Sequence, residues 1–179
     1  RQRAPVGKTL LLINIDETAI SLSPKAMAGN LFITKADQPV QRKRKGGDRA
    51  NLTHVAFACS DVELQSVLPQ VIIGNEHTIP AASLEELRNK CGPRVKVLRK
   101  ETSWVNGPVF AFILRLLADA LAPYREQVQP IVLFDAFGGH LTSDVWRACT
   151  LSKLWPMLVP AQATWLLQPL DTEGFAHYK

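Results

Sequence analysis

Three aspartates, Asp16, Asp135 and Asp171, each follow an apolar run and could together hold metal ions. The runs are 10–15, 131–134 and 166–170. An apolar run that stops at an Asp is typical of a buried parallel strand, and open α/β sheets bind their ligands at the carboxyl ends of such strands. Acids at the ends of neighbouring strands and at the start of a following helix can therefore converge above one sheet edge.

Such a set of carboxylates is suited to phosphodiester chemistry. Mg²⁺ takes oxygen ligands, and two ions roughly 3.5–4 Å apart can activate an attacking water or hydroxyl and stabilise the leaving oxygen. Clustered carboxylates repel one another, and metal binding relieves that repulsion. The alternative is that each Asp only caps a helix or forms a turn. Glu17 and Glu173 lie close to two of the proposed ligands in the sequence and could replace or support them.

The elements that must position these acids are strands first, and then strands that alternate with helices. Strands are expected at 10–15, 51–59, 67–73, 95–98, 131–134 and 156–160. Helices are expected at 83–90, which Ser83 and Glu86 open as a capping box, at 107–120, at 141–154 with Thr142 or Ser143 as the cap, and in a turn after Asp171. This order predicts a mixed sheet covered by helices.

Length and composition favour one domain. With 179 residues and 46% apolar residues, the chain can bury one substantial core. The net charge of +5 favours a polyanionic partner, although an excess of this size is also common in proteins that bind no nucleic acid. Cys59, Cys91 and Cys149 are odd in number and widely spaced, which indicates neither a disulfide framework nor a zinc site and fits a reducing compartment. No apolar run approaches the roughly 20 residues of a membrane span, and no signal peptide is evident.

A basic run surrounds the Gly46-Gly47 turn and suits a hairpin tip or loop. Its cations are Arg42, Lys43, Arg44, Lys45 and Arg49. Contact with DNA phosphates and a role as a solubilising or nuclear-localisation-like loop are both open.

Several of these segments, in this order, resemble one known family. The segments are NIDET (14–18), LFDAFGGH (133–140) and LQPLD (167–171), together with Thr53, Leu68-Pro69, Val159-Pro160-Ala161, Thr164, Phe175 and Lys179. The chain resembles, from about residue 10 to its end, the DDE-superfamily endonuclease domain of pogo-, Tigger- and jerky-like transposases. The ordered combination carries the resemblance, because each motif alone is weak.

The resemblance implies an α/β, RNase-H-like fold: a mixed five-stranded sheet flanked by helices, with a three-carboxylate site at the carboxyl edge. Residues 1–9 would be a basic tail or linker and 10–179 the catalytic domain, within a longer protein that carries helix-turn-helix domains upstream. The implied activity is metal-dependent DNA cleavage and strand transfer at transposon ends, with two Mg²⁺ or Mn²⁺ ions. The implied partners are transposon-end and target DNA and a second copy as a homodimer, in the nucleus, with no membrane and no small-molecule cofactor.

Carried over residue by residue, the resemblance makes Asp16, Asp135 and Asp171 the catalytic, metal-binding acids. His140 matches a family histidine and would contact the scissile phosphate or orient Asp135, or else be a turn histidine bonded to backbone. Gln168 would lie near the substrate.

Two departures from the family pattern leave a second function open. Ala136–Gly139 stands where relatives often have Asn-Ala-Pro-Ser, and Ser60–Val62 replaces a small-residue turn. A domesticated, catalytically silent DNA-binding or dimerisation domain is therefore the alternative. A haloacid-dehalogenase-like phosphatase is a third possibility, because residues 15–18 resemble its nucleophile loop. It ranks last, because that loop needs a second Asp two residues after Asp16, where this chain has Thr18.

Four tryptophans could stack on a terminal or flipped base, although tryptophans more often anchor cores and interfaces. They are Trp104, Trp146, Trp155 and Trp165. Trp104 and Trp165 are the better candidates because they flank predicted loops.

Overall fold

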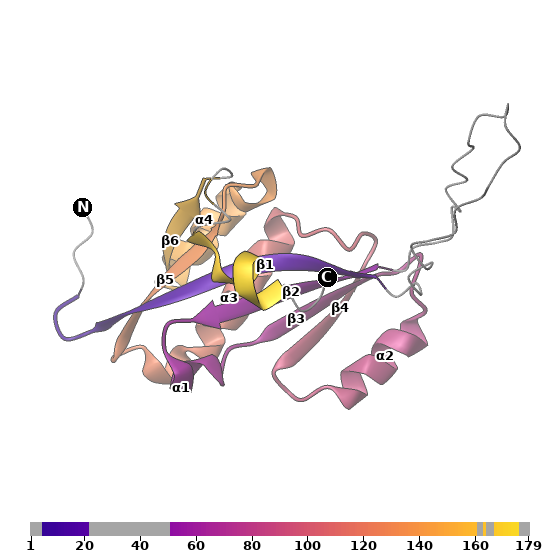
Figure 1. Cartoon of the computed structure of the whole chain (residues 1–179), viewed down its shortest axis with the longest axis horizontal. Coiled ribbons are helices and arrows are strands. Elements are labelled where there is room, and N and C mark those ends of the chain that lie inside the picture. Colours follow the sequence, from indigo (N-terminus) through magenta and orange to yellow (C-terminus); the bar gives the residue numbers. More distant parts are fainter. Residues whose placement is uncertain (1–4, 22–50, 161–162, 164–166, 176–179) are drawn as a thin grey trace, which may run out of the picture.

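A computed structural model of the chain describes residues 5–21, 51–160, 163 and 167–175 (Figure 1). The strands are β1 (Thr9–Ser21), β2 (Asn51–Cys59), β3 (Gln70–Asn75), β4 (Val95–Lys100), β5 (Val128–Asp135) and β6 (Trp155–Val159). The helices are α1 (Val62–Gln65), α2 (Ala81–Lys90), α3 (Gly107–Ala120) and α4 (Ser143–Leu151). Shorter turns are η1 (Ala122–Tyr124), η2 (Gly138–His140) and η4 (Leu170–Gly174), the last a π-helical turn.

One mixed sheet of six strands organises the described residues, in the order β4-β3-β2-β1-β5-β6. β1, β2 and β3 are antiparallel neighbours, whereas β5 runs parallel to both β1 and β6. This arrangement is the RNase-H-like fold that the sequence predicted, with six strands in place of the five that the resemblance implied. The strand expected at 95–98 is present as the edge strand β4, which pairs in parallel with the full length of β3.

Helices α3 and α4 pack on one face of the sheet, and η4 lies on the other (Figure 1). α3 begins where predicted, because the Asn106 side chain accepts a hydrogen bond from the Val109 amide at 3.1 Å and Pro108 occupies the first turn. Apolar residues of α3 recur at helical spacing and face the sheet. The buried core formed there includes Ile13, Ile15, Phe57, Phe110, Ile113, Leu117, Val132 and Phe134.

Two helix starts differ from the sequence prediction. α2 begins at Ala81 after Pro80 and has no side-chain cap, so the predicted capping box at Ser83 is wrong. Pro80 is the extended residue before the first turn, with φ −58° and ψ 142°, and the helix begins two residues ahead of Ser83. Asp61 accepts hydrogen bonds from the Glu63 and Leu64 amides and so caps the short, unpredicted α1. None of the helices in the described ranges is both long and apolar enough to cross a membrane.

Candidate active site

Asp16 and Asp135 lie side by side on neighbouring parallel strands. The last residue pair between β1 and β5 is Asn14 with Leu133, and each aspartate stands two residues further along its own strand. Equal offsets in a parallel register bring both side chains to the same point and the same face of the sheet.

Asp16 lies within β1 rather than at its end, which corrects the predicted strand boundary. Beyond Asn14 the strand loses its parallel partner β5, but it keeps its antiparallel partner β2 as far as Ser21. Asp16 itself pairs with Ala56 of β2. The backbone of Asp16 is therefore paired with β2 on one side, and on the other side it lies just past the last residue pair with β5.

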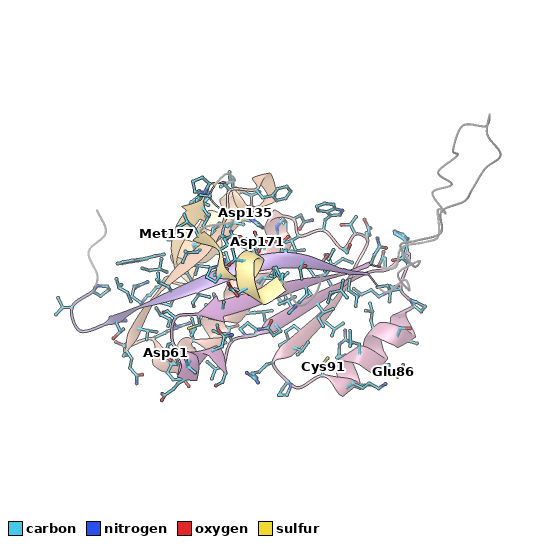
Figure 2. All side chains as sticks on the ribbon, in the orientation of Figure 1. Asp61, Glu86, Cys91, Asp135, Met157 and Asp171 are labelled. Atoms are coloured by element: carbon cyan, nitrogen blue, oxygen red, sulfur yellow. The ribbon has the colours of Figure 1, made fainter. Side chains whose placement is uncertain are left out.

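Asn14 brings the third acid to this point. Its Oδ1 accepts a hydrogen bond from the Leu170 amide at 3.1 Å, and its Nδ2 lies 3.4 Å from the Leu133 carbonyl. Leu170 and Phe175 pack on Ala56, so η4 is seated on the sheet next to Asp16. One buried amide thus joins the three segments that carry the acids, and Figure 2 shows Asp135 and Asp171 in this common region.

The sequence prediction missed Asn14 as a positioning residue. It is only 4% exposed, and it is the single polar residue in the run 10–15. Because a buried amide side chain needs hydrogen-bond partners, a lone Asn inside an apolar strand was the available signal.

Asp16 is poorly stabilised in its ionised form. Burial raises its pKa most, and the charge of Asp171, a side-chain hydrogen bond that protonated Asp16 can share with Asp171, and the charge of Asp135 add to this. Together they raise the pKa to about 7 against the one hydrogen bond that lowers it, from the Glu17 amide. That amide donates to Oδ1 at 2.8 Å, whereas no residue in the described ranges donates a hydrogen bond to the buried Oδ2. Asp171 offers only another carboxylate, which cannot donate to Oδ2 when both groups are ionised.

His140 is clamped between two acids from different strands. Its Nδ1 lies 2.6 Å from Asp135 Oδ1, and its Nε2 lies 3.0 Å from Glu17 Oε1. Its ring stacks on Phe110 with the ring centroids 4.0 Å apart. Nδ1 also lies 3.2 Å from the Asp135 carbonyl. The sequence had offered two roles, orienting the Asp135 side chain or bonding to backbone, and His140 makes both contacts.

These contacts decide the charge of His140. Burial alone lowers its pKa, but the hydrogen bonds to Asp135 and Glu17 and the charges of both acids raise it to about 9. The same hydrogen bond from His140 lowers the pKa of Asp135. At neutral pH the ring is therefore an imidazolium that donates from both nitrogens, while Asp135 is ionised.

Asp16 and Asp135, but not Asp171, line a small cavity of about 180 Å³. Its walls are Asp16, Glu17, Trp104, Asp135, Phe137 and His140. A larger cavity of about 620 Å³ lies between α3 and α4, but none of the three aspartates lines it. The chemistry, rather than the size, makes the smaller cavity the candidate active site.

The fold around this site is similar to that of a solved transposase. A Mos1 transposase paired-end complex with left transposon end matches with a TM-score of 0.54 and 16% identity, over 93% of this chain and 40% of the Mos1 chain. A Mos1 mariner paired-end complex with Mn matches over the same shares, with a TM-score of 0.53 and 16% identity. The chain has a DDE-transposase-like fold. It spans about 40% of the Mos1 chain, and the sequence matches neither a family model nor a curated protein.

The acids fit a cation chemically but do not form a ready-made cluster. In the ranges that the structure describes, no group of three or more His, Cys, Asp or Glu side chains is placed to hold a metal ion. The buried Asp16 Oδ2 nevertheless lacks a donor among the described residues, and the charges of two further carboxylates act on this side chain. A divalent ion is the partner that such an oxygen fits, and the carboxylates would have to close around it.

The remaining predicted site residues differ in their surroundings. Gln168 is buried, its Nε2 has no partner among the described atoms, and its carbonyl accepts from the Asp171 amide at 3.1 Å. Glu173 is exposed on η4. The basic residues Arg42, Lys43, Arg44, Lys45 and Arg49, and also Trp165, lie outside the described residues.

Proposed function

We propose that the chain is the catalytic domain of a DDE transposase of the pogo, Tigger and jerky-like type, which cleaves phosphodiester bonds at transposon ends and joins the freed strand to target DNA. The observation that carries this proposal is the meeting of Asp16 and Asp135 on adjacent parallel strands, with Asp171 near enough to raise the pKa of Asp16. The DDE-transposase-like fold supports it.

The metal-binding residues of the proposal are the three aspartates. Mg²⁺ or Mn²⁺, as a pair of ions held by Asp16, Asp135 and Asp171, would activate the attacking water or 3′-hydroxyl and stabilise the leaving oxygen. One of the Mos1 complexes was solved with Mn. Oδ2 of Asp16 would supply a ligand atom for such an ion, because no donor in the described part of the chain competes for it.

His140 is best assigned as a positioning residue. Both of its ring nitrogens are occupied, by Asp135 and by Glu17, so contact with a scissile phosphate would require one of these bonds to break. The imidazolium instead holds Oδ1 of Asp135, and the Phe137 amide also donates to this carboxylate, so the carboxylate is oriented from the protein side. The positive charge of the imidazolium also offsets the repulsion among the acids.

Nicking of supercoiled plasmid DNA by the purified chain tests the proposal. Parent protein is expected to nick in Mn²⁺ or Mg²⁺ and not in EDTA, and Asp135→Asn is expected to lose that activity because it removes a metal-binding oxygen. Asp119→Asn is the matched control, since Asp119 is an exposed acid on α3 that does not line the carboxylate cavity. Equal nicking by parent and Asp135→Asn, or nicking in EDTA, would show that the three acids are not the active site.

A catalytically silent DNA-binding or dimerisation domain is the second candidate. Two observations favour it: the lack of a ready metal cluster in the described ranges, and the Ala136–Gly139 turn beside Asp135. It predicts equal DNA affinity with and without Mg²⁺ and no nicking with either ion. DNA affinity that rises with Mg²⁺, accompanied by nicking, selects the transposase.

The partners and location follow from the same proposal. DNA ends and target DNA are the substrates, a homodimer would hold two ends together, and the protein would act in the nucleus. Sedimentation of the chain with and without DNA ends tests the dimer, and imaging of a tagged full-length protein tests the location. A chain that stays monomeric on DNA would contradict the proposed dimer, and a protein excluded from nuclei would contradict the proposed location.

A further inference from the structure

Trp104 is an exposed indole at the edge of the carboxylate cavity. It lies in the loop between β4 and α3, and 74% of it is exposed, against 39% of Trp146 on α4. Large aromatic side chains normally bury much of their surface, and an exposed one beside a site is a common contact for ligands.

Trp104 belongs to the walls of two cavities. The first contains Asp16 and Asp135, and the second, here called the side pocket, has a volume of about 290 Å³. The side pocket is lined by Glu17, Thr18, Ala19, Thr53, Ser103, Trp104 and Val105. Because Glu17 and Trp104 line both cavities, one nucleotide can place its phosphate at the acids and its base in the side pocket.

The lining of the side pocket suits a nucleobase rather than a phosphate. Among the described residues that line it there is no lysine or arginine, and its acid, Glu17, already accepts a hydrogen bond from His140. Three of its residues, Thr18, Thr53 and Ser103, carry hydroxyl groups, which can both donate and accept hydrogen bonds at a base edge. The volume lies at the lower end of small-molecule pockets, about 300 Å³, which suits one base.

We propose that the side pocket binds one unstacked base of the DNA strand, with Trp104 as its stacking platform. This inference rests on the proposed DNA-cleaving function and adds to it a subsite for the nucleotide next to the phosphate at the acids. A base leaves its stack at the lowest cost where it is unpaired, such as near a strand end. Stacking on an indole also tolerates any base, because every base has a π-face.

Binding to a duplex with a short single-stranded 3′ overhang tests the side pocket. Ca²⁺ replaces Mg²⁺ to prevent cleavage, and a 2-aminopurine in the overhang reports stacking through its fluorescence. Trp104→Ala is expected to weaken binding by about tenfold, within the range for loss of one base–aromatic stack, and to abolish the 2-aminopurine quenching. Trp104→Phe is expected to restore most of both signals, and Trp146→Ala to leave both unchanged.

A second probe carries an abasic residue in place of the 2-aminopurine. Together with Trp104→Ala it forms a double-mutant cycle in which one change is in the protein and the other is in the DNA. The parent is expected to bind this probe as weakly as Trp104→Ala binds the intact one, and Trp104→Ala is expected to bind both probes equally. Unchanged affinity and quenching in Trp104→Ala, or equal affinity of the parent for both probes, would overturn the side-pocket assignment.

The two levels of the proposal fail separately. Plasmid nicking by the parent and its loss in Asp135→Asn judge the enzyme function, whereas overhang binding in Ca²⁺ judges the side pocket. If the parent nicks DNA and Trp104→Ala binds the overhang normally, the proposed enzyme function is supported and the base-binding role of the side pocket is refuted. If the parent does not nick DNA but the 2-aminopurine quenching depends on Trp104, the enzyme function is refuted and the base-binding site is supported.

Discussion

Replacing Asp16 by Asn is expected to stabilise the protein at neutral and alkaline pH. The folded protein resists ionisation of this carboxyl group, because burial and the nearby charges of Asp171 and Asp135 raise its pKa from 3.8 to about 7. Asparagine keeps the shape of the side chain and removes the charge. The fold therefore loses the repulsion and keeps its packing.

The sign follows from proton linkage. Since the folded pKa of Asp16 lies above the unfolded value, protonated Asp16 supports the fold fully below pH about 4, and this support is lost as pH rises through about 7. A shift of this size corresponds to at most ~4 kcal/mol, and solvent screening of a partly exposed group reduces it to about 2–3 kcal/mol. Asp16→Asn should thus exceed the parent in free energy of unfolding by that amount at pH 8 and match it near pH 3.5.

Urea unfolding at several pH values, with and without Mg²⁺, measures both parts of this prediction. Mg²⁺ is expected to stabilise the parent at pH 8, because an ion offsets the charge of Asp16, and to stabilise Asp16→Asn less. Asp119→Asn is the control and should follow the parent. The parent and Asp16→Asn should both still lose stability as the pH rises from about 6.5 to about 9. In this window the folded protein keeps the proton on His140, whose pKa is raised to about 9, while the unfolded chain releases it.

Two results would refute this reasoning. If Asp16→Asn is no more stable than the parent at pH 8, the carboxyl group is not under the repulsion that its surroundings indicate. If Mg²⁺ stabilises both proteins equally, the ion does not bind at Asp16.

Two further substitutions test how the site is held together. Asn14→Ala removes the acceptor for the buried Leu170 amide, so we expect a loss of about 1–3 kcal/mol in urea unfolding and faster hydrogen exchange at that amide; unchanged exchange would show that Asn14 does not seat η4. Gly107→Ala places a Cβ 2.4 Å from Thr142 Oγ1, so we expect a loss of about 1–3 kcal/mol that Thr142→Ala largely restores in the double variant; additive losses in urea unfolding would contradict this close approach.

Local signals in the sequence were enough for several elements. The spacing of apolar residues predicted α3, and Gly107-Pro108 marked its start, as the structure confirms. The apolar run at 131–134 is confirmed as part of β5, which extends three residues earlier, to Val128. Local patterns succeed there because 3.6-residue spacing and helix-start chemistry act within a few residues.

Boundaries that depend on partners were less predictable. β1 continues past Asp16 because β2 lies beside it as far as Ser21, and no pattern within residues 10–15 contains that information. β4 became a full edge strand because β3 offers it hydrogen bonds along its length. Strand limits are decided by pairing between distant segments, so they follow from the sheet rather than from local propensity.

The sequence by itself determined which residues could do chemistry, since Asp16, Asp135 and Asp171 are marked by the apolar runs before them. Only the tertiary structure decided what surrounds them: the two acids that bind His140, the amide of Asn14 that joins three segments, and the buried oxygen of Asp16 that has no partner among the described residues. The physical reason is that burial and charge act through space. A pKa depends on neighbours that the chain brings together only when it folds.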